Sequence, residues 1–344
     1  MNGTTASLPA WLGILAFAAA GVLSHGAIRL LWPWLVRYAL ARQNARSSHS
    51  RPTPQGGGIA VVGATLVVVI AVFTARTGWT AGDSTQLAAV VSASLLLAVT
   101  GAVDDIHPIH PLPRLGLQMA AVALVIACLP ADLRVLSWLP WWPERAALLV
   151  AGLWFVNLVN FMDGIDWLTV AETVPVTGGL VLLGLFGALP PLGIATALAL
   201  AGAIIGFAPF NRPVARLFLG DVGSVPIGLI LAWLLALVAG AGHLAAAILL
   251  PLYYVADATI TVLRRLVRGE KIWQAHRTHF YQQATSRGFS VSAVVARVFL
   301  VNLGLVVLAV ATLWQASLAM QATALVLGCA LVGWLLRVFA RGRQ

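Results

Sequence analysis

Long apolar runs recur along the whole chain and constrain its fold more than any other feature. Eleven such runs are present, most of them roughly 16–25 residues long, close to the roughly 20 residues with which a helix crosses the hydrocarbon core of a bilayer. They lie at about residues 9–36, 58–75, 86–103, 114–129, 144–160, 172–187, 190–207, 222–240, 243–264, 291–313 and 318–340. The sequence therefore predicts an all-α, polytopic membrane protein with about 11 transmembrane helices.

The composition supports this class and sets others aside. Hydrophobic residues make up 60% of the 344 residues and charged residues only 9%, too few to cover a soluble domain with a polar surface. We see no soluble domain, internal repeat or linker, so we expect a single integral membrane domain over residues 1–344. The net charge of +10 does not indicate a nucleic-acid partner, because the placement of the basic residues has a more ordinary explanation.

The charged residues lie mainly on one side of the predicted membrane. If the loop after the first run is cytoplasmic, 16 of the 21 Lys and Arg residues fall on that face. This places the N-terminus outside and the C-terminus in the cytoplasm. Eight of the 11 acidic residues also lie toward this face, although orientation alone does not require that. We therefore expect an active site on the cytoplasmic face, with basic loops against anionic membrane lipid.

Five polar segments interrupt the apolar pattern on this face. The first, residues 44–58, ends in three glycines. They let backbone N–H groups approach an anion at a helix start, or they make a flexible loop before the helix. The second is the adjacent pair Asp104 and Asp105, which closes an apolar run. Anions are disfavoured at a helix C-terminus and near the membrane, so this pair needs a cation, a proton or a catalytic task unless it is solvated at the interface.

The third segment carries Asn157, Asn160 and Asp163 at intervals of three residues, which puts them on one helical face if the helix continues. Asp166 extends the series unless Gly164 ends the helix first. Amide and carboxylate oxygens on one stripe suit a hydrated Mg²⁺ that is shared with phosphate. A polar seam between helices is the alternative.

The fourth segment, residues 207–224, places Arg212 and Arg216 before Asp221 at the start of a new apolar run. The arginines can pair with phosphate or anionic lipid. Asp221 is a candidate metal ligand, with helix N-capping as a competing explanation.

The fifth segment begins inside an apolar run, where Pro251 should kink the helix and Asp257 is an intramembrane carboxylate. Such a carboxylate is a functional candidate, although pairing with a neighbouring cation is an equal alternative. His276, Arg277 and His279 follow in a basic loop and could bind a pyrophosphate, ligate a metal or move protons. A basic amphipathic segment lying on anionic lipid is the other interpretation.

Together these segments carry a family resemblance, because they occur in the order and at about the spacing of one family's motifs. The chain resembles the polyprenyl-phosphate N-acetylhexosamine-1-phosphate transferases, glycosyltransferase family 4, over roughly residues 40–290, with residues 291–344 forming two C-terminal transmembrane helices. The form of the last motif resembles the branch that starts bacterial O-antigen and related surface glycans. The motifs are Arg51-Pro-Thr-Pro-Gln-Gly-Gly57, Asp104-Asp105, Asn157-x-x-Asn160-x-x-Asp163-Gly-Ile-Asp166, Phe218-Leu-Gly-Asp-Val-Gly-Ser224 and Ala275-His-Arg-Thr-His-Phe-Tyr-Gln282.

The resemblance implies a Mg²⁺-dependent reaction, with Mn²⁺ as a substitute, at the inner face of the bacterial plasma membrane. Undecaprenyl phosphate, the polyprenyl phosphate acceptor, attacks the β-phosphorus of a UDP-N-acetylhexosamine and UMP leaves. By analogy the catalytic residues are Asp104, Asp105, Asp163 and Asp221, and the metal ligands are Asp221, Asn160 and Asp163. The implied substrate-binding residues are Arg51, Thr53, Gly57, Asn157, Asn160, Asp166, Phe218, His276, Arg277 and His279.

Some alternatives stay open at this stage. The donor is either UDP-GlcNAc or a 6-deoxy-N-acetylhexosamine such as FucNAc or QuiNAc, and relatives suggest a homodimer. Trp167 stands where relatives commonly have a glycine, close to the expected nucleotide site. A secondary transporter is the rival from another class, since intramembrane carboxylates and broken helices also occur there.

Overall fold

The predicted all-α architecture is confirmed in a computed structural model, which describes residues 7–40, 53–271, 276–315 and 317–342. Each of the predicted apolar runs contains a helix, and the bounds agree within a few residues. The helices of the described residues are α1 (Ala10–Tyr38), α2 (Gly57–Ala75), α3 (Ala81–Ile106), α4 (Pro111–Ala127), α5 (Trp141–Met162), α6 (Leu168–Leu185), α7 (Pro191–Phe207), α8 (Asp221–Gly240), α9 (Leu244–Leu249), α10 (Leu252–Val267), α11 (Phe280–Ser286), α12 (Val291–Trp314) and α13 (Leu318–Arg341).

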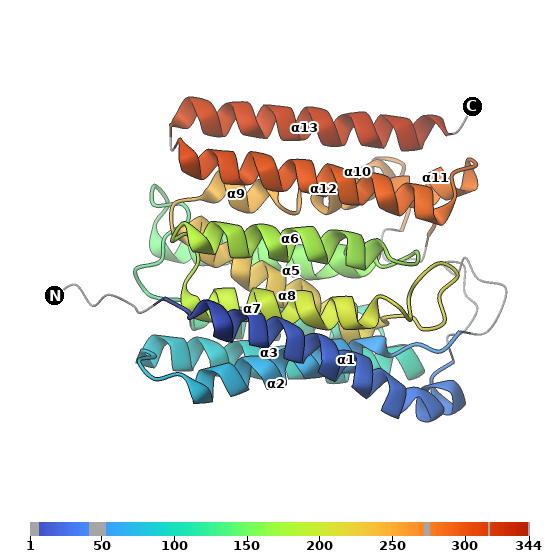
Figure 1. Ribbon diagram of the computed structural model, residues 1–344. Coiled ribbons are helices and arrows are strands. Elements are labelled where there is room, and N and C mark those ends of the chain that lie inside the picture. Colours follow the sequence, from blue (N-terminus) through green and yellow to red (C-terminus); the bar gives the residue numbers. More distant parts are fainter. Residues whose placement is uncertain (1–6, 41–52, 272–275, 316, 343–344) are drawn as a thin grey trace.

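The long helices lie side by side along one common direction (Figure 1). Helix α8 occupies the middle of the bundle and is buried along nearly its whole length, in contact with α3, α5 and α2. Helices α1 and α13 lie at opposite borders and keep much of their surface exposed. Because these exposed side chains are apolar, the outer surface suits lipid and the protein is a multi-pass membrane protein.

Eight of the described helices are long and apolar enough to cross a membrane, and α4 and α7 are shorter apolar helices of 17 residues each. The ninth predicted run is broken in two. Helix α9 ends just before Pro251 and α10 begins just after it, so the kink expected at this proline is confirmed. The break follows from chemistry, because proline lacks the N–H group that would continue the helix ladder.

Helix α8 is held against its neighbours by contacts that only glycine allows. A Cβ atom at Gly101 of α3 would lie 2.5 Å from the main chain of Asp221. A Cβ at Gly58 of α2 would lie 2.2 Å from the Cα of Gly223. Both distances are far below any real carbon–carbon contact, so these glycines let the first turn of α8 pack backbone to backbone on two helices.

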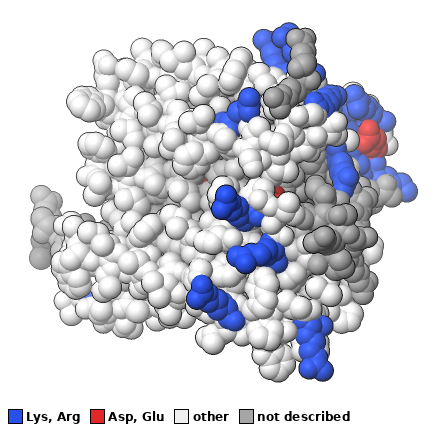
Figure 2. Space-filling view, turned by 45° about the vertical axis from the view of Figure 1, so that its right-hand side comes forward, with Lys and Arg blue, Asp and Glu red and all other residues white. Residues whose placement is uncertain are grey.

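The two ends of the bundle differ in character. One end, here called the site end, carries the connections at residues 107–110, 163–167 and 208–220, and most of the visible Lys and Arg side chains gather over it (Figure 2). The opposite end carries the connection at residues 128–140, which holds Trp138 and leads into Trp141 and Trp142 at the start of α5. There Glu144 pairs with Arg134 and accepts hydrogen bonds from the backbone N–H groups of Val135 and Leu136.

Candidate active site

Asp105 fastens the first turn of α8. Its two carboxylate oxygens accept hydrogen bonds from the backbone N–H groups of Asp221, at 3.0 Å, and Val222, at 3.2 Å. Gly220 precedes the helix in a left-handed conformation with φ of 78°, and a Cβ there would meet the Asp105 carboxylate at 2.6 Å. The N-cap of α8 is therefore supplied by a residue of α3 more than a hundred positions away. The alternative that Asp221 itself caps this helix is wrong.

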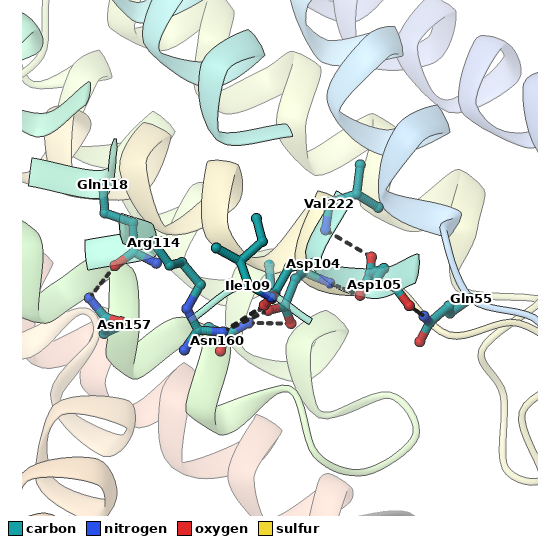
Figure 3. Close-up of polar contacts among 11 residues, drawn as sticks. Gln55, Asp104, Asp105, Ile109, Arg114, Gln118, Asn157, Asn160 and Val222 are labelled. Carbon is teal, nitrogen blue, oxygen red and sulfur yellow. Dashed lines mark hydrogen bonds and ion pairs between the residues drawn. The ribbon is translucent and has the colours of Figure 1, made fainter. Parts of the chain in front are cut away.

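Because Asp221 does not cap the helix, its carboxylate faces the site instead. One oxygen accepts a hydrogen bond from the Asn160 amide at 2.7 Å, and the other lies 3.4 Å from the Arg114 guanidinium (Figure 3). The same amide nitrogen of Asn160 lies 3.0 Å from the hydroxyl of Ser224. Asn160 of α5 and Asp221 of α8 thus form the centre of the cluster.

Arg114 is a site residue that the sequence reasoning did not select. It lies in the first turn of α4 and donates to Asp104 at 2.7 Å as well as contacting Asp221. Asp104 also accepts from the backbone N–H of Ile109 at 2.6 Å. The adjacent carboxylates therefore have different partners: Asp104 binds an arginine, and Asp105 binds the start of a helix. An arginine ten residues after an acidic pair was the signal that could have identified Arg114.

The polar residues predicted to share one face of α5 contact two different helices, α4 and α8. Asn157 donates to Gln118 of α4 at 2.8 Å (Figure 3), whereas Asn160 donates to Asp221 of α8. The helix ends at Met162, one residue before Asp163, so the series does not continue to Asp166 as a helical face. Asp163 accepts a hydrogen bond from Thr169. Burial removes water from Asp163 and raises the pKa of its carboxyl group to about 8, and the nearby Asp221 and Asp105 carboxylates add to this rise. The hydrogen bond from Thr169 acts in the opposite direction and lowers the pKa.

The first polar segment packs on the fourth. The N–H groups of Gly57 and Gly58 donate to the carbonyls of Phe218 and Leu219 at 3.0 and 2.9 Å, and the Gln55 side chain donates to the carbonyl of Asp105 at 2.7 Å. These glycine N–H groups are therefore engaged within the protein, and the glycines serve close packing. Substrate contacts by Gly57 and by the buried Thr53 stay predictions, and Arg51 lies outside the described residues.

The turn after α5 organises the loop before α8. Asp166 is buried and accepts from the backbone N–H of Ala215 at 2.9 Å. Trp167 donates its backbone N–H to Asn211 at 2.7 Å and its indole N–H to the carbonyl of Ala208 at 2.6 Å. Asn211 in turn donates to the carbonyl of Leu217. This loop, residues 208–217, carries the exposed Arg212 and Arg216 and leads into Phe218, which is half-buried.

The fifth segment docks on the same turn. The Tyr281 hydroxyl donates to the carbonyl of Phe161 at 3.0 Å, and a Cβ at Gly164 would lie 2.1 Å from that hydroxyl oxygen. His276 and His279 stack at 4.9 Å between ring centroids, with His279 buried. Arg277 is exposed. All five polar segments therefore meet, in their described parts, at the site end of the bundle.

Comparisons with known proteins show the family to which the chain belongs. Residues 87–239, from α3 to α8, match the family model described as glycosyl transferase family 4. A phospho-N-acetylmuramoyl-pentapeptide-transferase of Shouchella clausii is 30% identical over 62% of this chain and 70% of its own length. The chain belongs to glycosyl transferase family 4, the polyprenyl-phosphate N-acetylhexosamine-1-phosphate transferases.

Two further relatives of this transferase are similar over most of their length. A decaprenyl-phosphate N-acetylglucosaminephosphotransferase of Mycobacterium leprae is 27% identical over 83% of this chain and 78% of its own length. A Bacillus subtilis protein named as a probable undecaprenyl-phosphate N-acetylglucosaminyl 1-phosphate transferase is 23% identical over 88% of this chain and 87% of its own. The family assignment makes the protein an enzyme, so the transporter alternative is wrong.

The donor set of the transferase suits a Mg²⁺ ion. Among the described residues, no three His, Cys, Asp or Glu side chains converge into a complete metal centre. Mg²⁺ does not require one, because it is usually held by one or two carboxylates together with water and substrate phosphates. The candidate ligands are Asp221, Asp163 and the amide oxygen of Asn160. The carboxylates gathered here outnumber the Arg114 charge that contacts them, which favours a bound cation.

Replacing Arg114 by glutamine tests its contribution to the transferase. The change leaves Asp104 and Asp221 without their guanidinium, so their mutual repulsion rises and the cluster spreads. We expect the rate of UMP release to fall about 10–100-fold, within the range found when a residue that orients a metal ligand is removed. Arg114→Lys, which keeps the charge but not the planar guanidinium, should lose less. Equal activity of the glutamine variant and the unchanged protein would show that Arg114 is dispensable.

The conformation of Trp167 makes a separate prediction about stability. Trp167 is the one non-glycine residue with a positive φ, 63°, among the residues that the structure describes. This left-handed conformation costs a residue with a Cβ roughly 1–2 kcal/mol. Trp167→Gly and Trp167→Ala both remove the indole, but only glycine relieves this cost. We expect the glycine variant to be about 1 kcal/mol more stable than the alanine variant in thermal unfolding in detergent. The reverse order would contradict the left-handed conformation.

Proposed function

We propose that this transferase moves an N-acetylhexosamine 1-phosphate from a UDP-sugar to undecaprenyl phosphate, giving undecaprenyl-diphospho-N-acetylhexosamine and UMP. One observation carries the proposal: the acidic side chains meet at the start of α8, inside the stretch that matches the family model. There Asp221 accepts from Asn160, shares Arg114 with Asp104, and donates its backbone N–H to Asp105. A phosphate oxygen of the lipid forms a bond to the β-phosphorus. The bond from that phosphorus to the bridging oxygen breaks, and its electron pair leaves with UMP.

Each residue of the cluster has a role that follows from its hydrogen-bond partners. Arg114 links the Asp104 and Asp221 carboxylates, so it sets the distance between α4 and α8 at the reacting centre. Asp105 holds the start of α8 and thereby the position of Asp221. Asp221, Asn160 and Asp163 would hold Mg²⁺, with Mn²⁺ as a substitute. When bound, the ion supplies charge that neutralises the diphosphate and the UMP leaving group.

The remaining residues would bind the two substrates. Asp166 and Phe218 would contact the uracil, and His276, Arg277 and His279 would hold the diphosphate of the donor. Asn157 and the first segment, with Arg51, Thr53 and Gly57, would complete the substrate pocket. The break between α9 and α10 would offer the polyprenyl chain a groove.

The site end would face the cytoplasm at the inner membrane of a bacterium. The basic side chains over that end support this orientation, since basic residues are enriched in cytoplasmic loops, and they suit contact with anionic lipid. The protein would catalyse the first membrane step of O-antigen, lipopolysaccharide or another surface glycan, a placement supported by the His-Arg-Thr-His-Phe-Tyr-Gln form of the fifth segment. A homodimer is part of this proposal by analogy with relatives.

The test uses purified protein in detergent with undecaprenyl phosphate and Mg²⁺. UDP-GlcNAc, UDP-GalNAc and a UDP-6-deoxy-N-acetylhexosamine are supplied separately, and UMP release is followed. We expect UMP from one donor, no UMP without the lipid, and loss of release with EDTA that added Mg²⁺ restores. Release that persists in EDTA would remove the metal from the proposal. Folded protein that releases no UMP from any of these donors would contradict the proposed reaction with them.

A further inference from the structure

Asp257 is buried completely within α10, yet its carboxylate is fully engaged by another part of the chain. Its side chain has no exposed surface. One oxygen accepts from the backbone N–H of Phe280 at 3.0 Å and the other from the backbone N–H of Tyr281 at 3.2 Å. The hydroxyls of Tyr253 and Thr261 lie at 3.2 and 3.3 Å. Both oxygens of this buried carboxylate therefore act as hydrogen-bond acceptors toward the backbone of another segment.

The two peptide N–H groups belong to the first turn of α11. This helix has only seven residues, too few to be stable without tertiary support. Its leading N–H groups would be unsatisfied without a cap. Asp257 supplies that cap from α10, more than twenty residues earlier, just as Asp105 does for α8.

The same carboxylate contacts the residue before α11. Nδ1 of His279 lies 3.3 Å from Oδ1 of Asp257. This contact occupies Nδ1, which leaves Nε2 as the ring nitrogen that can meet a substrate. The imidazole is further restrained by stacking against His276 at 4.9 Å and Tyr281 at 5.7 Å between ring centroids.

The start of α11 is also attached to the reacting centre. Tyr281 donates to the carbonyl of Phe161 at the end of α5, two residues before Asp163. The position of His279 is therefore defined from two sides: by Asp257 in α10 and by the turn that carries Asp163.

We propose that Asp257 is a positioning residue that fixes the imidazole of His279 so that Nε2 faces the diphosphate of the sugar-nucleotide donor. This inference rests on the proposed function for the identity of the ligand. It assigns the intramembrane carboxylate a role distinct from metal binding, and it explains why an acidic side chain lies in an apolar helix beside a histidine-containing segment.

A double-mutant cycle tests the proposal. Asp257→Asn, His279→Gln and the double variant are purified, and kcat and KM for the UDP-sugar are measured for each. Asparagine keeps the shape but turns one accepting oxygen into a donor that opposes a backbone N–H or the imidazole. We expect Asp257→Asn to reduce kcat/KM about 10–100-fold, mainly through a higher KM for the UDP-sugar. The double variant should be no worse than His279→Gln alone, because both single changes disrupt the same Asp257–His279 interaction.

Glu172 provides the matched control. It is also a buried carboxylate, in α6, and accepts a hydrogen bond from Asn302 of α12 at 2.6 Å. Glu172→Gln should leave KM for the UDP-sugar close to that of the unchanged protein, and its effect should multiply with that of His279→Gln. If Asp257→Asn also leaves KM for the UDP-sugar unchanged and its effect multiplies with that of His279→Gln, the positioning role is overturned. Should Asp257→Asn not yield folded protein, the cycle is made with Asp257→Glu, which keeps the charge but moves the oxygens.

Hydrogen–deuterium exchange separates this inference from the proposed reaction, because it needs no donor. Backbone amides of the peptide that covers residues 280–286 should exchange at least about tenfold faster in Asp257→Asn, whereas amides at the start of α8 should be unchanged. Unchanged exchange at 280–286 would overturn the positioning role whether or not the enzyme turns over. Faster exchange in a protein that releases no UMP from any donor would sustain the anchoring of α11 while refuting the proposed reaction.

Discussion

Asp221→Asn is expected to reduce UMP release by roughly a thousandfold while leaving the fold intact. The loss corresponds to about 4 kcal/mol of transition-state stabilisation, the scale on which a metal-binding carboxylate acts. The fold should survive because Asp221 does not cap α8. Asparagine can still accept from Asn160 through its remaining oxygen, and Arg114 keeps its bond to Asp104. Losing one charge at a helix N-terminus costs only about 0.3–1 kcal/mol.

The measurement is UMP release as a function of Mg²⁺ concentration, with thermal unfolding in detergent beside it. Asp132→Asn is the control, because it removes an exposed carboxylate from the opposite end of the bundle. We expect the Asp221 variant to need more Mg²⁺ and the Asp132 variant to match the unchanged protein. Turnover of the Asp221 variant within a few-fold of normal at low Mg²⁺ would remove Asp221 from the metal site.

Asp105→Asn is expected to reduce turnover about a hundredfold by a different route. Its carboxylate accepts two backbone N–H groups from the first turn of α8. An asparagine has one accepting oxygen and presents an amide donor to the other N–H. An unsatisfied buried donor costs about 1–3 kcal/mol, so the helix start should shift. A displacement of about 1 Å at a reacting group is enough for a hundredfold loss, and Asp221 is the group displaced.

Two readouts distinguish this route from direct catalysis by Asp105. The variant should unfold at a lower temperature than the unchanged protein, and its UDP-sugar binding, measured by titration, should be retained. Gln55→Leu is the control, since the Gln55 side chain donates to the backbone carbonyl of Asp105 and not to its carboxylate, so this variant should show a few-fold effect at most. Loss of nucleotide binding in Asp105→Asn would move this residue to the donor side of the site.

Much of the architecture follows from the sequence because its physical cause is local. A run of apolar residues must form a helix in lipid, since every backbone polar group has to be satisfied within the segment. The apolar runs therefore predicted the helices within a few residues, and Pro251 predicted the break between α9 and α10. The residue types of the site were also readable, because carboxylates and amides are costly beside a membrane and cluster only where they have a task.

The partners of these residues depend on the tertiary structure alone. The sequence could not tell whether Asp221 or Asp105 caps α8, because the answer depends on α3 approaching the helix start closely enough for only glycine to fit at position 101. The same holds for Arg114, which reaches Asp221 across a hundred residues. Asp257 was seen as an intramembrane carboxylate, but its role as a cap required α11 to fold back onto α10. A hydrogen bond forms only between atoms brought within about 3 Å, and long-range packing decides which atoms those are.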